Sequence, residues 1–78
     1  MANPANIKSG IKRRKAIVRY IQQYTKRNGF PPTHQEIGDH LGVSKTAIRH
    51  HLIILQHDGE ISRQPGTSRS VRVRGIRV

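Results

Sequence analysis

The side chains that could bind a metal or catalyse a reaction are five histidines and four carboxylates. His34 and His40 are six positions apart, as are His51 and His57, and neighbours such as His50 and His51 point about 100° apart on a helix. None of these spacings is the i, i+4 pair typical of a helical zinc site, and the chain has no cysteine. The sequence therefore predicts no metal site.

Catalysis has equally little support. Glu36 and Asp39 lie three positions apart, but Glu36 is explained by a helix cap and Asp39 by an ordinary surface position. Ser44 has no base and no orienting group placed around it by the sequence. We expect a protein that is not an enzyme, with no cofactor and no small-molecule substrate.

The basic side chains carry the clearest signal, because the formal net charge is +11 with 15 Lys and Arg against four Asp and Glu. Residues 1–27 hold eight basic side chains and residues 62–78 hold five, and neither segment holds an acidic one. Residues 28–61 are weakly acidic. A small basic domain most often neutralises phosphates, so nucleic acid is the expected partner. Disorder would also fit the charge, but 33% hydrophobic residues in periodic segments favour folding.

The size of the chain limits its organisation. Seventy-eight residues without an internal repeat correspond to one small domain, and the absence of cysteine excludes a disulfide framework. The longest aliphatic run, residues 52–55, is too short to cross a bilayer, and the first ten residues contain no apolar signal segment. We expect a soluble, cytoplasmic and nucleoid-associated protein with no membrane partner.

Helical periodicity and stop signals divide the first half of the chain. Ile17 and Ile21 lie on one face of a helix predicted over residues 9–28 and ended by Gly29. The prolines at 31 and 32 prevent its continuation. A long first helix is therefore expected, with a flexible basic arm at residues 1–8.

Two shorter helices follow. Thr33 and Glu36 have the spacing of a capping box, which opens a second helix that stops at Gly42. Ser44 is suited to cap a third helix over residues 44–58. The tight turn between them is typical of a helix-turn-helix.

After residue 59 the hydrophobic period changes from helical to alternating. Residues 61–64 and 69–74 are predicted as strands around a turn at residues 65–68, and Val71 and Val73 alternate with polar positions. The fold class is therefore mainly α with a small β-hairpin: a winged helix-turn-helix domain over residues 9–74, with three helices, a two-stranded wing and a short tail at 75–78.

The run from about residue 17 to 73 resembles the DNA-binding domain of LexA-type repressors. The resemblance is carried by Gly-Phe-Pro-Pro-Thr at 29–33, Glu-Ile at 36–37, Leu-Gly at 41–42, Ser44, His-Leu at 51–52, Leu55, Gly-Glu-Ile at 59–61 and Gly-Thr-Ser-Arg at 66–69. It implies sequence-specific binding of double-stranded DNA by a small transcriptional regulator or repressor. 

Two features depart from the family pattern. The self-cleaving domain of the full-length repressors, with its serine and lysine pair, has no room in 78 residues, so autolysis is not expected. The turn is one residue shorter than in the enterobacterial repressor, and Arg49 and His50 stand where that protein has an acidic pair. The operator sequence therefore does not carry over.

The third helix is expected to enter the major groove with its first half against base edges. The face opposite its apolar stripe and the resemblance together give the predicted base contacts. These are Ser44, Thr46, Ala47, Arg49 and His50. Arg49 is the preferred reader, because its guanidinium can bind guanine O6 and N7 together; a phosphate contact or a solvated side chain are the alternatives.

Contacts to the DNA backbone or minor groove are expected from three places: the start of the first helix, the first turn of the third helix, and the wing. The predicted residues are Lys12, Arg13, Arg14, Lys15, Lys45, Gly66, Thr67, Ser68, Arg69, Arg72 and Arg74. A charged surface without DNA contact is the alternative for each cluster.

Two other functions remain open at this stage. The same scaffold could package nucleic acid without sequence preference, or it could be a protein-interaction module, since its centre is weakly acidic. A lone domain covers few base pairs, so a homodimer on a repeated or palindromic site is also expected, with Ile53, Ile76 or Val78 as contact residues.

Overall fold

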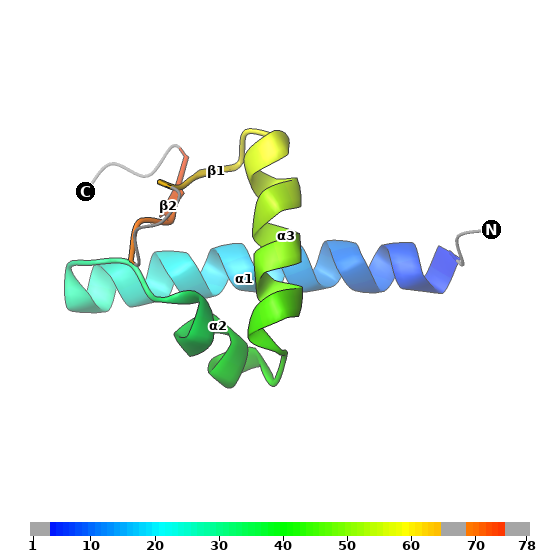
Figure 1. Ribbon diagram of the computed structural model, residues 1–78, viewed down its shortest axis with the longest axis horizontal. Helices are drawn as coiled ribbons and strands as arrows, with labels where there is room; N and C mark the ends of the chain where they lie inside the picture. The colour runs from blue at the N-terminus through cyan, green and yellow to red at the C-terminus, as the bar shows by residue number, and fades with distance from the viewer. Residues whose placement is uncertain (1–3, 65–68, 75–78) are drawn as a thin grey trace.

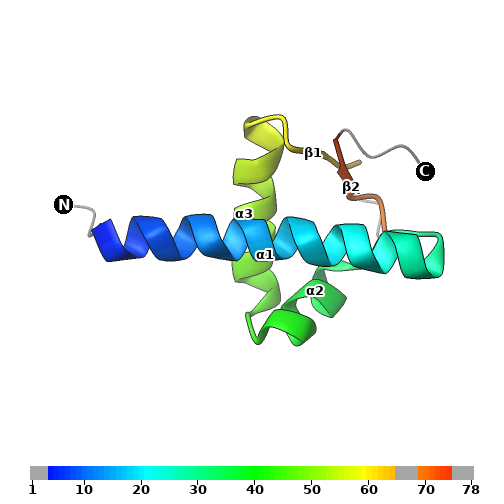
Figure 2. The same ribbon diagram turned by 180° about the vertical axis from the view of Figure 1, so that it is seen from behind.

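The computed structural model describes residues 4–64 and 69–74, which form three helices and one antiparallel hairpin. The helices are α1 (Pro4–Asn28), α2 (His34–Leu41) and α3 (Lys45–His57), and the strands are β1 (Ile61–Ser62) and β2 (Arg72–Val73). Helix α3 crosses α1 at a wide angle, with α2 beside it (Figure 1), and the reverse view places α1 in front (Figure 2). The predicted winged helix-turn-helix is confirmed.

Helix α1 begins at Pro4, which is earlier than the predicted start at residue 9. Proline is favoured in the first turn of a helix, because the amide it lacks has no partner there and its φ is already helical. Residues 4–8, predicted as a flexible arm, are therefore helical, while residues 1–3 lie outside the described part of the chain. Gly29, at φ 82°, ends the helix as predicted.

The core is built from aliphatic side chains of all the elements. The buried hydrophobic side chains are Ile17, Ile21, Ile37, Ile48, Leu52, Leu55, Ile61 and Val71. Every helix contributes the face that its periodicity predicts, and removing this apolar surface from water is the main stabilising contribution to the fold. None of the helices in the described residues is long and apolar enough to cross a membrane.

The predicted caps of α2 and α3 are confirmed. The Thr33 amide donates to Glu36 Oε1 at 2.8 Å, and the Glu36 amide donates to Thr33 Oγ1 at 3.1 Å, which completes the capping box. Gly42 closes α2 at φ 68°, and Ser44 caps α3. Side chains thus satisfy amides that a helix start leaves without partners.

The turn between α2 and α3 depends on a glycine inside α2. A Cβ at Gly38 would lie 2.5 Å from the Val43 carbonyl oxygen, and the Val43 amide donates to the Gly38 carbonyl at 2.9 Å. The backbone of the turn therefore packs directly against α2 where a side chain would have been. This close approach fixes the direction in which α3 leaves α2.

The two strands of the wing are shorter than predicted. Ile61 pairs with Val73 and Ser62 with Arg72, whereas the strands were expected to reach residue 64 and to start at 69. The reason is local: Ser70 Oγ accepts from the Gln64 amide and donates to the Gln64 carbonyl, both at 3.1 Å, so a side chain replaces the ladder there.

The alternation predicted for residues 71–74 is confirmed, with Val71 buried, Val73 half-buried, and Arg72 and Arg74 exposed. This pattern points the valines at the helices and the guanidinium groups outward. The turn at 65–68 and the tail at 75–78 lie outside the described residues.

Candidate nucleic-acid interface

One face of α3 is left uncovered by the rest of the molecule. Ile48, Leu52 and Leu55 are buried against α1, α2 and the wing. On the opposite side the exposed residues are Lys45, Thr46, Arg49, His50, Ile53 and His57. The outward position predicted for Thr46, Arg49 and His50 is therefore confirmed, while their contacts with DNA stay predictions.

Two predicted base-contact residues have structural roles in the first turn of α3. Ser44 Oγ accepts a hydrogen bond from the Ala47 amide at 3.1 Å, so the hydroxyl already serves as the helix cap. Ser44 is exposed and Ala47 is half-buried. Both lie at the exposed N-terminal end of α3, where backbone amides and the helix dipole favour an anion.

A positive region extends from α3 toward the wing and α2. The pKa of His34, at the start of α2, is lowered by burial and then by the charges of Arg63, Lys45 and Arg49. Three cations from the wing and α3 therefore act on one point of α2. The sequence predicted Lys45 and Arg49 separately as DNA contacts, but their convergence with Arg63 on His34 is visible only in the fold.

The wing itself contains a basic hollow of about 400 Å³. It is lined by Ser62, Arg63, Gln64, Arg69, Ser70 and Arg72. Arg63 is held by α3, since its Nε donates to Gln56 Oε1 at 2.8 Å. The guanidinium groups of Arg63 and Arg72 beside an open hollow are suited to phosphate oxygens.

The other side of α3 is next to the basic start of α1. The pKa of His51 is lowered by burial and then by Arg14 and Arg13, so these arginines lie near α3. His51 is half-buried, and its Nδ1 is buried without a hydrogen-bond partner in the described part of the chain. Positive charge thus flanks α3 on both sides.

The basic run at 12–15 does not form one patch. Lys12 and Arg13 line a hollow beside Leu41 at the end of α2, whereas Arg14 and Lys15 line a groove shared with Asp58. Consecutive residues project in different directions around a helix, so the run divides between two sides of α1. The sequence count of cations therefore overstates how many can meet one ligand.

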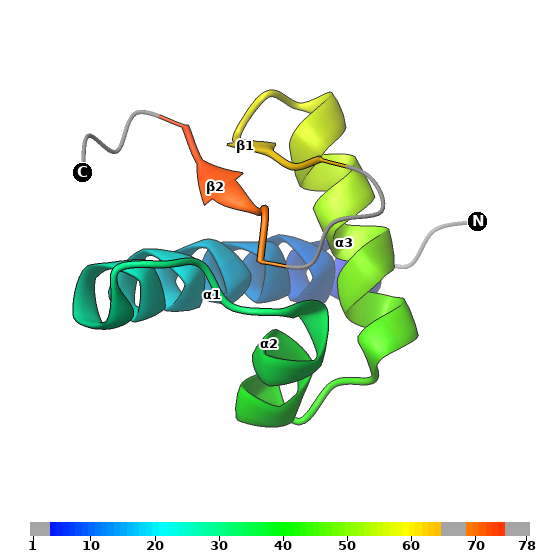
Figure 3. The ribbon, with the colours of Figure 1, turned by 60° about the vertical axis from the view of Figure 1, so that its left-hand side comes forward.

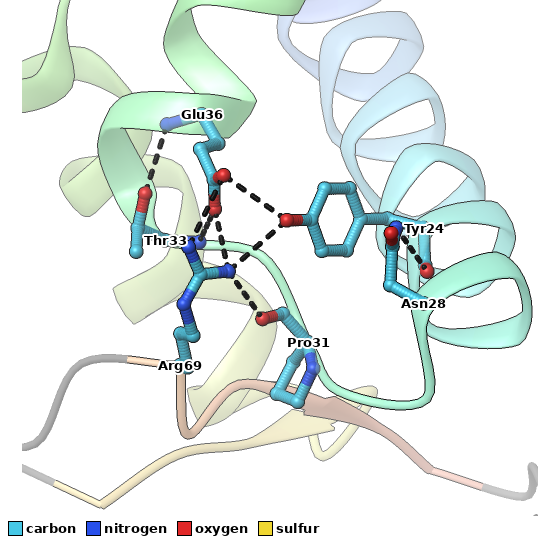
Figure 4. A network of polar contacts seen from close by, with 6 residues as sticks. All are labelled: Tyr24, Asn28, Pro31, Thr33, Glu36 and Arg69. Carbon is cyan, nitrogen blue, oxygen red and sulfur yellow. Dashed lines mark hydrogen bonds and ion pairs between the residues drawn. The ribbon is translucent and has the colours of Figure 1, made fainter.

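One wing arginine, Arg69, has partners inside the protein that sequence reasoning missed. Arg69 Nη1 lies 2.7 Å from Glu36 Oε1 and donates to the Tyr24 hydroxyl at 3.1 Å (Figure 4). The Arg69 Cζ also lies 5.0 Å from the centre of the Phe30 ring. Arg74 Nη1 lies 3.2 Å from where a Cβ on Gly59 would be, so it covers the turn after α3.

The carboxylate of Glu36 is strongly acidic. Hydrogen bonds from the Thr33 amide and from Arg69 lower the pKa of Glu36 from 4.5 to about 2, and Tyr24 adds a third donor. Glu36 is therefore ionised at every physiological pH.

No group of three or more His, Asp or Glu side chains that could hold a metal ion occurs within residues 4–64 and 69–74. The predicted contacts Gly66, Thr67 and Ser68 lie outside these ranges.

Comparison with known proteins identifies similar sequences. The sequence model of one family, described as the LexA DNA binding domain, matches residues 9–70. "LexA repressor 2" of Geobacter sulfurreducens is 36% identical over 64 residues, 81% of this chain and 32% of that protein. "LexA repressor 1" of Pseudomonas putida is 40% identical over 65 residues, 82% of this chain and 32% of that protein. This chain thus spans about a third of the length of these relatives.

Proposed function

Because the chain belongs to the LexA DNA-binding domain family, we propose that it binds double-stranded DNA at a specific sequence and represses transcription by occluding a promoter or operator. The observation that carries the proposal is the exposed face of α3 with Lys45 and Arg49 on it, beside which the wing's Arg63 donates to Gln56 of the same helix at 2.8 Å. A helix of this kind fits the major groove, and the flanking cations are suited to the phosphates on either side. Figure 3 shows α3 at one edge of the molecule, together with α2 and the hairpin.

The proposed readers are the first-half residues of α3. Arg49 would bind a guanine through its two terminal nitrogens, and Thr46 and His50 would meet neighbouring base edges. At the start of the helix, Ser44 would contact a phosphate or a base, and Ala47 would contact a thymine methyl group.

The proposed grips are cations that remain exposed. They are Lys12, Arg13, Lys15, Lys45, Arg72 and Arg74, together with the half-buried Arg14, and the run at 12–15 offers its cations on two sides of α1. Such contacts supply affinity but carry no sequence information. We also propose that two copies occupy a repeated or palindromic site, since one domain spans few base pairs; Ile53, 46% exposed on α3, is a candidate contact residue.

The proposal is tested by selecting binding sites from a random duplex pool and measuring affinity by fluorescence anisotropy. The expected result is one preferred site, bound much more tightly than unrelated duplex at physiological salt. Affinity should fall with salt at a slope of about −0.9 per phosphate neutralised. If unrelated duplex competes equally well, the protein packages nucleic acid without sequence preference and the repressor proposal is wrong.

Two substitutions separate readers from grips. Arg49→Ala should relax the preference at one base position, a loss of about 1–3 kcal/mol of discrimination. Arg72→Ala should weaken binding to all duplexes similarly and reduce the salt slope by about 1. Arg27→Ala is the matched control, because it removes the same charge from an exposed position near the end of α1, and it should change little.

A further inference from the structure

Three segments of the protein converge on the guanidinium of Arg69 (Figure 4). From α2, Glu36 receives Arg69 Nη1 on Oε1 at 2.7 Å and Nη2 on Oε2 at 3.2 Å. From α1, the hydroxyl of Tyr24 accepts from Nη1 at 3.1 Å and donates to Glu36 Oε2 at 3.0 Å. From the loop between them, the Pro31 carbonyl accepts from Nη1 at 3.3 Å.

The ring of Phe30 makes a further contact, with the Arg69 Cζ 5.0 Å from its centre. A guanidinium over an aromatic face is attracted by the ring quadrupole. Phe30 is 45% exposed, so this contact lies at the surface rather than in the core. Arg69 is therefore held by an ion pair, a stacked ring and two neutral acceptors at once.

The backbone at Arg69 shows where this anchor acts. Its φ is 57°, a left-handed conformation that is uncommon for a residue with a Cβ and persists where surrounding contacts hold it. The next residue, Ser70, bridges to Gln64 on the other side of the wing turn. Arg69 thus lies between the turn and β2, which begins at Arg72. Its side chain binds this point of the chain to α1 through Tyr24 and to α2 through Glu36.

We propose that Arg69 is a positioning residue, which sets the orientation of the wing against α2 and α3 and does not serve as a phosphate contact. This inference rests on the proposed DNA binding, and it replaces the expectation that Arg69 grips the backbone. The charge of Arg69 is already compensated by Glu36, which holds it with two oxygens. Arg72, which directly follows Val71, is exposed and remains available for phosphate.

A positioning role and a phosphate-contact role for Arg69 predict different effects of Glu36→Gln on the affinity for DNA. Glu36→Gln removes the ionised partner of Arg69 but keeps an amide oxygen for the Thr33 amide, since glutamine also forms capping boxes. If Arg69 positions the wing, the variant should bind the selected duplex more weakly, on the order of twofold to 150-fold, the range that corresponds to coupling energies between contacting residues. If Arg69 contacts phosphate, releasing it should leave affinity unchanged or raise it.

Asp39→Asn is the matched control for the lost negative charge. Asp39 is an exposed carboxylate on the same helix, and its hydrogen bond from Gln35 at 2.8 Å can be accepted by an amide oxygen. This variant should bind as well as the wild type or slightly better. Circular dichroism at the temperature of the binding assay verifies that both variants are folded.

A second experiment tests whether Arg69 acts through the wing. Arg69→Met is introduced into the wild type, into Arg72→Ala and into Arg49→Ala, and the loss of affinity is compared. The loss should shrink in the Arg72→Ala background and stay unchanged in the Arg49→Ala background. An equal loss in all three, or a Glu36→Gln variant that binds no more weakly than the wild type, overturns the positioning role.

These outcomes are separate from the fate of the proposed function. Absence of any preferred duplex for the wild type would contradict the DNA-binding proposal itself. Preferred binding by the wild type with normal binding by Glu36→Gln would contradict only the role of Arg69.

Discussion

The helical body (α1, α2 and α3) and the wing (residues 61–64 and 69–74) are held in place by different interactions. The body contributes six of the buried aliphatic side chains, while the wing contributes only Ile61 and Val71. The wing compensates with directional contacts: two pairs of ladder residues, the bridge at Ser70 and the ion pair of Arg69. Hydrophobic contacts thus set the shape of the body, whereas the placement of the wing depends on charge and hydrogen bonds.

The largest effect is expected from a truncation in the body. Leu52→Ala removes a fully buried side chain at the centre of α3 and should lower the free energy of unfolding by about 2–5 kcal/mol. Because small domains are stable by only about 5–15 kcal/mol, the melting temperature should fall steeply. Thermal denaturation followed by circular dichroism measures this. A variant that melts like the wild type would show that α3 is not held by its apolar stripe.

The next substitution acts on the turn within the body. Gly38→Ala would stabilise an ordinary helix position, but here the added methyl meets the Val43 carbonyl oxygen. Crowding of this kind costs about 1–3 kcal/mol, so a net loss of stability is expected. The same denaturation experiment decides it: a stabilised variant would mean that the turn relaxes easily, and that the direction of α3 is not fixed there.

A truncation in the wing should cost less. Val71→Ala removes two buried methyl groups and should lower the free energy of unfolding by about 1.5 kcal/mol, from roughly 0.8 kcal/mol for each buried CH₂. The loss should be smaller than that of Leu52→Ala in the same denaturation series. Equal losses would show that the wing and the body share one core without distinction.

The smallest effect is expected from the ionisation of Glu36, which makes the stability of the fold depend on pH. The pKa of Glu36 is lowered from 4.5 to about 2 in the folded protein, so the folded state binds fewer protons than the unfolded state between these values. Its contribution to stability is present above pH 4.5 and is lost as the pH falls toward 2. Melting temperatures at pH 6, 4 and 2.5 should fall less for Glu36→Gln than for the wild type. Parallel curves would show that the carboxylate does not stabilise the fold.

This division also explains what could be predicted from the sequence. The helices were recognised because periodicity, caps and glycine stops are local signals, as at Thr33, Gly42 and Ser44. The early start of α1 was missed because the first turn lacks an apolar pattern and is favoured by Pro4 alone.

The pairing of Arg69 with Glu36 spans 33 positions and has no periodic trace, so sequence reasoning placed that arginine outward. The division of the basic run around α1 follows from helical periodicity, whereas the neighbours of each half, Leu41 and Asp58, needed the three-dimensional arrangement. The exposed face of α3 was predicted because it is the complement of an apolar stripe.

The length of α1 has a consequence for how the molecule rotates in solution. The protein measures 41 × 24 × 23 Å, and α1 lies along the longest dimension while α3 crosses it (Figure 1). Amide bonds in a helix point along its axis, so those of α1 sense only slow end-over-end tumbling, whereas those of α3 also sense faster spinning about the long axis. Nitrogen-15 relaxation should therefore give a higher ratio of transverse to longitudinal rates in α1 than in α3.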